Sequence, residues 1–128
     1  MNADTEGKVY PAVEVEVEPQ RLADFRAVFG QASGVPPTFV TTIEFLAFAQ
    51  VAADPELALD FSRVVHGAQE FDHRRPVREG ETVTAAIRVD SVRGIGTNAF
   101  LVVITDIVDE DGSLVCVAKS TMVERGTL

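Results

Sequence analysis

The chain has 128 residues and a mass of 13.8 kDa, a length typical of a single domain. Hydrophobic residues make up 46% and charged residues 24%, the balance of a globular protein with a core and not of a disordered chain. The net charge of −9 excludes nucleic acid as an expected partner, because phosphates repel an acidic protein. A lone cysteine, Cys116, excludes an internal disulfide and a cysteine zinc cluster, and we expect no metal site.

The first seven residues are polar and acidic, and we expect residues 1–7 to form a tail outside a domain that spans residues 8–125. This segment lacks the basic start and apolar stretch of a signal peptide. No uncharged apolar run approaches the roughly 20 residues that cross a bilayer. The expectation is therefore a cytoplasmic protein without a membrane-spanning segment.

A strand followed by a short helix is predicted next. Valine and glutamate alternate within residues 9–18, which indicates a half-buried strand with its glutamates in water. Pro19 ends this pattern, and apolar residues at helical spacing predict a short amphipathic helix over residues 20–29. Residues 30–37 contain two glycines and two prolines, which predict a loop.

Residues 38–53 predict a long helix that is apolar on nearly all sides, with Glu44 and Gln50 as its only strongly polar residues. Such a helix must be covered by other elements on most of its surface. Asp54 and Pro55 end it.

The rest of the chain has the pattern of four strands, over residues 64–74, 81–92, 98–108 and 114–123. Glycine-containing turn sequences separate them at residues 78–80, 93–96 and 109–112. We expect three consecutive hairpins in one antiparallel sheet, with Gln69, Phe71 and His73 on one face of the first strand. Helices and strands are segregated along the chain, so the predicted class is α+β. A curved sheet wrapped around the long helix, aided by a second copy or a partner, would cover it.

Two motifs connect the chain to a known family. The segment from His66 to Phe71 reads His-Gly-Ala-Gln-Glu-Phe, and Arg75-Pro76 with Gly80-Glu81 follow it. The predicted long helix opens with Pro36-Pro37-Thr38-Phe39. On these residues the chain resembles the N-terminal, FAS1-like half of MaoC-type dehydratases. The resemblance implies a hotdog fold, in which a five-stranded antiparallel sheet wraps a central helix and two such units pair side by side.

MaoC-like proteins hydrate trans-2-enoyl thioesters of coenzyme A or acyl carrier protein, or dehydrate the (R)-3-hydroxyacyl form. Their catalytic half carries Asp-x-Asn-Pro-x-His before the central helix, and this acid and imidazole activate a water. Here the corresponding residues 30–35 contain neither an acid nor a histidine. The resemblance therefore implies a noncatalytic, acyl-chain-accommodating subunit of a heteromeric hydratase or dehydratase of lipid or sterol side-chain metabolism. A partner would supply the dyad, and no cofactor is expected.

The resemblance also implies two sets of substrate contacts. If the central helix forms a wall of the acyl tunnel, its candidate contacts are Phe39, Ile43 and Phe48, although phenylalanines here equally suit a core. The only concentration of basic residues comprises Arg63, Arg74, Arg75 and Arg78. Arginine binds phosphate well, so this set is a candidate for the phosphates of coenzyme A or carrier protein. The same arginines could equally neutralise the acidic residues around them.

Glu44 and His66 offer an alternative function. A carboxylate within an apolar helix is costly unless it is paired, solvated or functional. Hotdog thioesterases place an acid on this helix, often near a His-Gly pair, so a self-sufficient homodimeric acyl-CoA thioesterase is the second hypothesis. The structural interpretation is that Glu44 forms a capping box with Thr41 or pairs with an arginine, and that His66 makes a structural hydrogen bond. A non-enzymatic acyl-binding partner is the third hypothesis.

Overall fold

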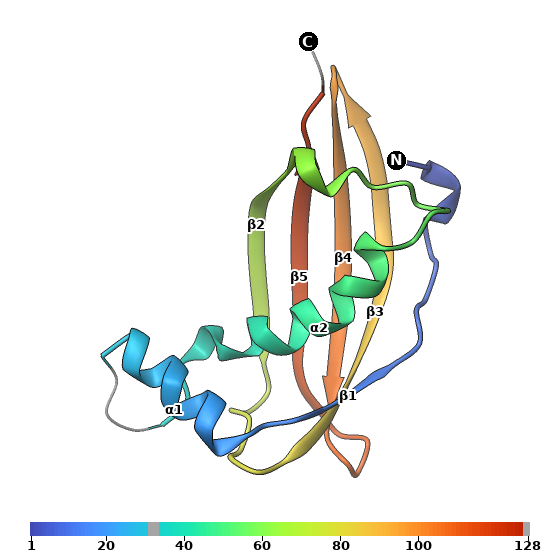
Figure 1. Cartoon of the computed structure of the whole chain (residues 1–128). Coiled ribbons are helices and arrows are strands. Elements are labelled where there is room, and N and C mark those ends of the chain that lie inside the picture. Colours follow the sequence, from blue (N-terminus) through green and yellow to red (C-terminus); the bar gives the residue numbers. More distant parts are fainter. Residues whose placement is uncertain (31–33, 127–128) are drawn as a thin grey trace.

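The computed structural model describes residues 1–30 and 34–126 (Figure 1). In chain order its helices and strands are β1 (Val13–Glu16), α1 (Pro19–Val28), α2 (Val40–Ala52), β2 (Val64–His73), β3 (Thr82–Ile95), β4 (Asn98–Val108) and β5 (Leu114–Glu124). Short 3-10 turns occupy Ala3–Thr5, Pro37–Phe39 and Phe61–Arg63. The turn at Pro37–Phe39 explains why the central helix starts later than the sequence pattern predicts.

The five strands form one antiparallel sheet in the order β1-β3-β4-β5-β2. The hairpin expected between the first two of the four predicted strands is wrong. In the sheet, β3 is separated from β2 by β4 and β5. Strand β2 pairs with β5 instead, with Gln69 opposite Ser120. The two later hairpins are confirmed. The first of them turns only at Gly96 and Thr97, because pairing continues to the end of β3.

Helix α2 lies across one face of the sheet (Figure 1). Its residues Ile43, Ala47 and Val51 are at most 1% exposed and belong to the core between helix and sheet. Burial of each large aliphatic side chain contributes about 1.5–3 kcal/mol. On another side of the helix, Phe45 and Leu46 remain 48% and 44% exposed. The sheet therefore covers the apolar helix only in part.

The N-terminal residues are packed against the sheet and do not form the expected free tail. Thr5 is buried, and the N–H of Gly7 donates to the Val89 carbonyl at 2.8 Å. The N–H of Val92 donates to the Glu6 carboxylate at 2.8 Å. The polar residues of this segment thus join the fold through hydrogen bonds of the backbone and of the Glu6 carboxylate, which its polar composition did not predict. None of the helices in the described residues has the length and apolar character needed to cross a membrane.

Candidate functional site

Strand β2 carries His66 and the predicted face of Gln69, Phe71 and His73, and a β-bulge sets the direction of these side chains. The register with β5 shifts between His66 and Ala68, so that Gly67 is the extra residue. Because a bulge reverses the alternation of faces, His66 before it lies on the same face as Gln69 after it. The expected shared face of Gln69, Phe71 and His73 agrees with their β5 partners, the buried residues Ser120, Ala118 and Cys116.

Glu44 lies between α2 and the sheet, 1% exposed, in a polar cluster with one residue from each of two strands. The amide of Gln69 donates to Glu44 Oε2 at 3.3 Å, and Ser120 Oγ lies 3.0 Å from the same oxygen. Ser120 Oγ also hydrogen-bonds Gln69 Oε1. Glu44 Oε1 is buried without a hydrogen-bond partner among the described residues. We call Glu44, Gln69 and Ser120 the polar ring.

The hydrogen-bond pattern of the polar ring favours a neutral Glu44. A serine hydroxyl carries one hydrogen, and an amide oxygen and a carboxylate can only accept. If Ser120 donates to Gln69 Oε1, its contact with Glu44 Oε2 needs a hydrogen from Glu44. If the amide is reversed, Ser120 can donate to Glu44, but the Gln69 oxygen then lies 3.3 Å from Glu44 Oε2, which disfavours a charge on Glu44. Burial independently raises the pKa of Glu44, and the two hydrogen bonds and nearby His66 offset only part of that effect.

The structural roles proposed for Glu44 from sequence are wrong. Helix α2 starts at Val40 without a side-chain cap, and the hydroxyl of Thr41 donates to the Thr38 carbonyl instead of joining a capping box. The partners of Glu44 are an amide and a hydroxyl, not an arginine. His66 is exposed, and its Nε2 lies 3.1 Å from the Ala68 carbonyl, which confirms a local hydrogen bond.

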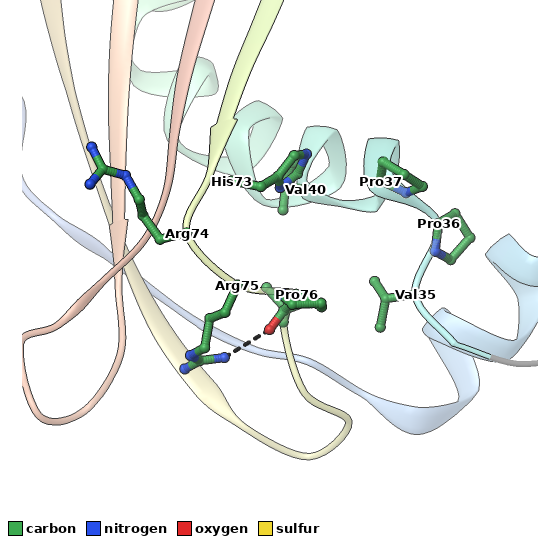
Figure 2. A pocket seen from close by; sticks show the side chains of 9 residues that line it. Val35, Pro36, Pro37, Val40, His73, Arg74, Arg75 and Pro76 are labelled. Atoms are coloured by element: carbon green, nitrogen blue, oxygen red, sulfur yellow. Dashed lines mark hydrogen bonds between the residues drawn. The ribbon is translucent and has the colours of Figure 1, made fainter.

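Two cavities lie along the boundary between α2 and β2. The Phe48 cavity measures about 480 Å³ and is mostly apolar, lined by Phe45, Phe48, Ala49, Ala52, Phe61, Val64, His66 and Met122. The Val40 cavity measures about 370 Å³ and is lined by Val35, Pro36, Pro37, Val40, His73, Arg74, Arg75, Pro76 and Val77. Figure 2 shows His73 beside Val40 in this second cavity, with the guanidinium groups of Arg74 and Arg75 pointing away from Val35.

The structure separates the four predicted phosphate-binding arginines. Arg63 precedes β2 and pairs with Asp60 at 2.9 Å, whereas the other three follow that ten-residue strand. Arg74 pairs with Asp72 at 3.0 Å. In the described part of the chain, Arg78 alone of the four has no carboxylate partner for its exposed guanidinium.

Arg75 is held most firmly of the four. It hydrogen-bonds Glu81 at 3.0 Å and Asp109 at 3.3 Å, which ties the segment after β2 to the turn between β4 and β5. The hydrogen bond from Arg75 holds the pKa of Glu81 below its usual range. Neutralisation of nearby carboxylates therefore describes Arg75 in this structure, and phosphate binding by the four arginines stays a prediction.

The three apolar candidates for contact with the acyl chain lie in different surroundings. Phe39 and Ile43 are each 1% exposed and lie in the core, whereas Phe48 lines a cavity. Sequence reasoning missed Ser120 as a partner of Glu44. The available signal was a serine at an inward-facing position of a strand, between Ala118 and Met122. The segment expected to replace the catalytic loop includes residues 31–33, which lie outside the described residues.

One antiparallel sheet with a single long helix across its face, and with apolar cavities beside that helix, defines a hotdog-fold protein. The sequence matches the family described as "FAS1-like, dehydratase domain region" over residues 26–118. The chain therefore belongs to this family of MaoC-like hotdog proteins. A "UPF0336 protein" of Saccharopolyspora erythraea is 45% identical over 92 residues. The match covers 72% of this chain but only 59% of that relative.

Solved structures share the fold at low sequence identity. The C-terminally truncated HadBC (3R-hydroxyacyl-ACP dehydratase) complex of Mycobacterium tuberculosis superposes with a TM-score of 0.82 and 20% identity, covering 96% of this chain and 99% of the other. The ChsH1-ChsH2 complex of the same organism gives a TM-score of 0.69 at 11% identity, covering 94% and 86%. These similarities establish the hotdog fold of the chain.

Proposed function

We propose that this chain is the noncatalytic, acyl-chain-accommodating subunit of a heteromeric MaoC-like (R)-specific enoyl thioester hydratase or dehydratase. The observation that carries the proposal is that the Phe48 cavity lies beside a sheet edge suited to a partner. A catalytic hotdog chain seated there would supply the Asp and His that activate water. The lack of any acid or histidine in residues 30–35 supports this division of labour.

The two edges of the sheet differ in their capacity to add a strand. Strand β2 is ten residues long and leaves one side unpaired among the described strands, with Val65 45% exposed. Next to it, Phe45 of α2 and Phe61 expose apolar surface beside Val64 and His66. A long unpaired edge beside exposed apolar side chains is typical of an interface. At the opposite edge β1 has four residues, two of them exposed glutamates.

The similar structures are described as complexes, HadBC and ChsH1-ChsH2, and this supports a partner for the present chain. In the proposed assembly the acyl chain of a coenzyme A or carrier-protein thioester enters the Phe48 cavity. The reaction needs no cofactor and belongs to lipid or sterol side-chain metabolism in the cytoplasm.

The thioesterase hypothesis requires Glu44 or His66 to attack a thioester or activate water. A nucleophile or general base must reach the substrate and must be ionised or able to accept a proton. Glu44 is 1% exposed, and the hydrogen bonds of the polar ring favour its neutral form. No observation favours this second function over the proposed one.

Co-expression tests the proposal. The chain is produced together with the MaoC-type chain encoded nearest to it that carries Asp-x-Asn-Pro-x-His, and the mixture is analysed by size-exclusion chromatography. We expect a stable complex that hydrates enoyl-coenzyme A of long chains, while the present chain alone hydrates none. Robust hydration, or release of free thiol from acyl-coenzyme A, by the homogeneous single chain contradicts the noncatalytic role.

A further inference from the structure

The polar ring lies between the two cavities. Along α2, Val40 lines one cavity, Glu44 follows one turn later, and Phe48 lines the other cavity after one more turn. Along β2, the same order is His73, Gln69 and His66. The hydrogen bond from Gln69 to Glu44 therefore joins strand and helix at a position between the two cavities.

The space beside this hydrogen bond is also occupied. Phe71 shares the face of Gln69 and His73, is partly buried and packs against the core. The centroid of its aromatic ring lies 5.4 Å from that of His73. These two side chains occupy the space between the polar ring and the Val40 cavity. Ser120 closes the third side from β5. No polar atom of Glu44 faces solvent, since the side chain is buried.

From this arrangement we propose that the polar ring is a partition that ends the acyl-chain path at the Phe48 cavity and so limits the chain length that the complex accepts. The inference rests on the proposed function, because the occupant of the cavity is the substrate's acyl chain. A neutral ring suits this position, since an uncharged polar group costs less than a carboxylate beside a hydrocarbon chain. Removal of the Gln69 side chain would free space beneath α2 between the two cavities.

Gln69 allows a matched pair of variants. Gln69→Ala removes both the hydrogen bond to Glu44 and the side-chain volume between the two cavities. Gln69→Leu removes the hydrogen bond but retains most of the volume, so it separates the effect of space from that of polarity. Both variants leave Glu44 with Ser120 as a partner. Thermal unfolding shows that each variant folds, and size-exclusion chromatography shows that it forms the complex, before kinetics are compared.

The assay uses the co-expressed complex with crotonyl-, dodecenoyl- and hexadecenoyl-coenzyme A. We expect Gln69→Ala to raise kcat/KM for the longest substrate relative to crotonyl-coenzyme A by at least about tenfold, through KM, as expected when extra methylenes gain a pocket. Gln69→Leu keeps the wild-type profile. An unchanged profile in a folded, active Gln69→Ala complex overturns the partition and leaves the proposed function standing. A wild-type chain that neither binds the catalytic chain nor alters its hydration of these substrates overturns both.

Discussion

Ser120 Oγ on β5 lies 3.0 Å from the carboxyl oxygen Oε2 of Glu44, a residue 76 positions earlier in the chain. This contact joins the central helix to the middle of the sheet inside the core. Because its other neighbour, Gln69 Oε1, can only accept, the serine hydroxyl cannot donate to both. The hydrogen-bond pattern of this contact therefore depends on the protonation state of Glu44, and it leads to the first two predictions.

Ser120→Ala should lower the free energy of unfolding by about 1–3 kcal/mol, because it leaves buried polar atoms of Glu44 and Gln69 with one partner fewer. Urea unfolding of the purified chain measures the loss. Ser113→Ala is the matched control, since exposed Ser113 contacts Asp109 through its backbone N–H. Equal stabilities of the two variants would show that the polar ring contributes nothing.

Glu44→Gln should remove a pH dependence of stability. In the folded protein the pKa of Glu44 is raised above its usual 4.5 by burial. The native state therefore binds this proton more tightly, and the contribution is complete below about pH 4.5 and declines as pH rises through the raised pKa. We expect the stability of Glu44→Gln relative to wild type to increase toward alkaline pH, by at most about 1.4 kcal/mol per pH unit.

Denaturant unfolding across this pH range measures the effect. The neighbouring titratable groups, His66 and Cys116, are present in both proteins, so their contributions largely cancel. Burial raises the pKa of the Cys116 thiol to about 11, which keeps it neutral in this range. A stability difference independent of pH would mean that Glu44 titrates normally, and the neutral ring would then be incorrect.

The contribution of Asp54 to stability should depend on pH in the opposite direction to that of Glu44. It follows α2 and accepts hydrogen bonds from Lys8 Nζ and Tyr10 Oη, both at 2.7 Å. The bond from Lys8, then that from Tyr10, lowers the pKa of Asp54 from 3.8 to about 2. Its stabilisation is therefore present above about pH 3.8 and is lost as pH falls through about 2.

Asp54→Asn should accordingly be less stable than wild type at neutral pH, and the difference should shrink in acid. Circular dichroism of unfolding at a series of pH values measures it. Glu56→Gln is the control, since Glu56 also contacts Lys8 but is 59% exposed, and surface pairs contribute little. A neutral-pH loss for Asp54→Asn no larger than that of the control would count against the network.

Phe45→Glu should weaken assembly without unfolding the chain. Phe45 is 48% exposed on α2 beside the β2 edge, so a charge there meets water in the free chain and apolar surface in the proposed complex. We expect at least about tenfold weaker binding of the catalytic chain, or about 1.4 kcal/mol, by isothermal titration calorimetry. Val28→Glu on α1, where Val28 is 78% exposed, is the control. Wild-type affinity for Phe45→Glu would place the interface elsewhere.

Elements with a strong local pattern were predictable. The strand expected over residues 98–108 is β4 with the same bounds, and the helix expected over 20–29 is α1, displaced by one residue. Alternation and helical spacing are properties of neighbouring residues, so the sequence alone reveals them. The family motifs likewise predicted the hotdog fold.

Long-range relationships were not predictable in the same way. The pairing of β2 with β5 brings together segments far apart in the chain, and turn sequences cannot reveal it. The bulge at Gly67 changes which residues of β2 face α2, although alternation by itself would separate His66 from Gln69. The hydrogen-bond partners of Glu44, Gln69 and Ser120, lie 25 and 76 positions away in the sequence, so the capping box expected within its own helix is wrong.

The difference between the two edges of the sheet limits how many units can pair edge to edge. A unit that joins a partner through β2 retains only β1 as an open edge on its own side. That strand is four residues long, and its exposed Glu14 and Glu16 would meet like charges on any second copy that approached with the same edge. In the proposed assembly growth would therefore stop after one pairing event, so that the fold favours a closed pair over an open-ended filament.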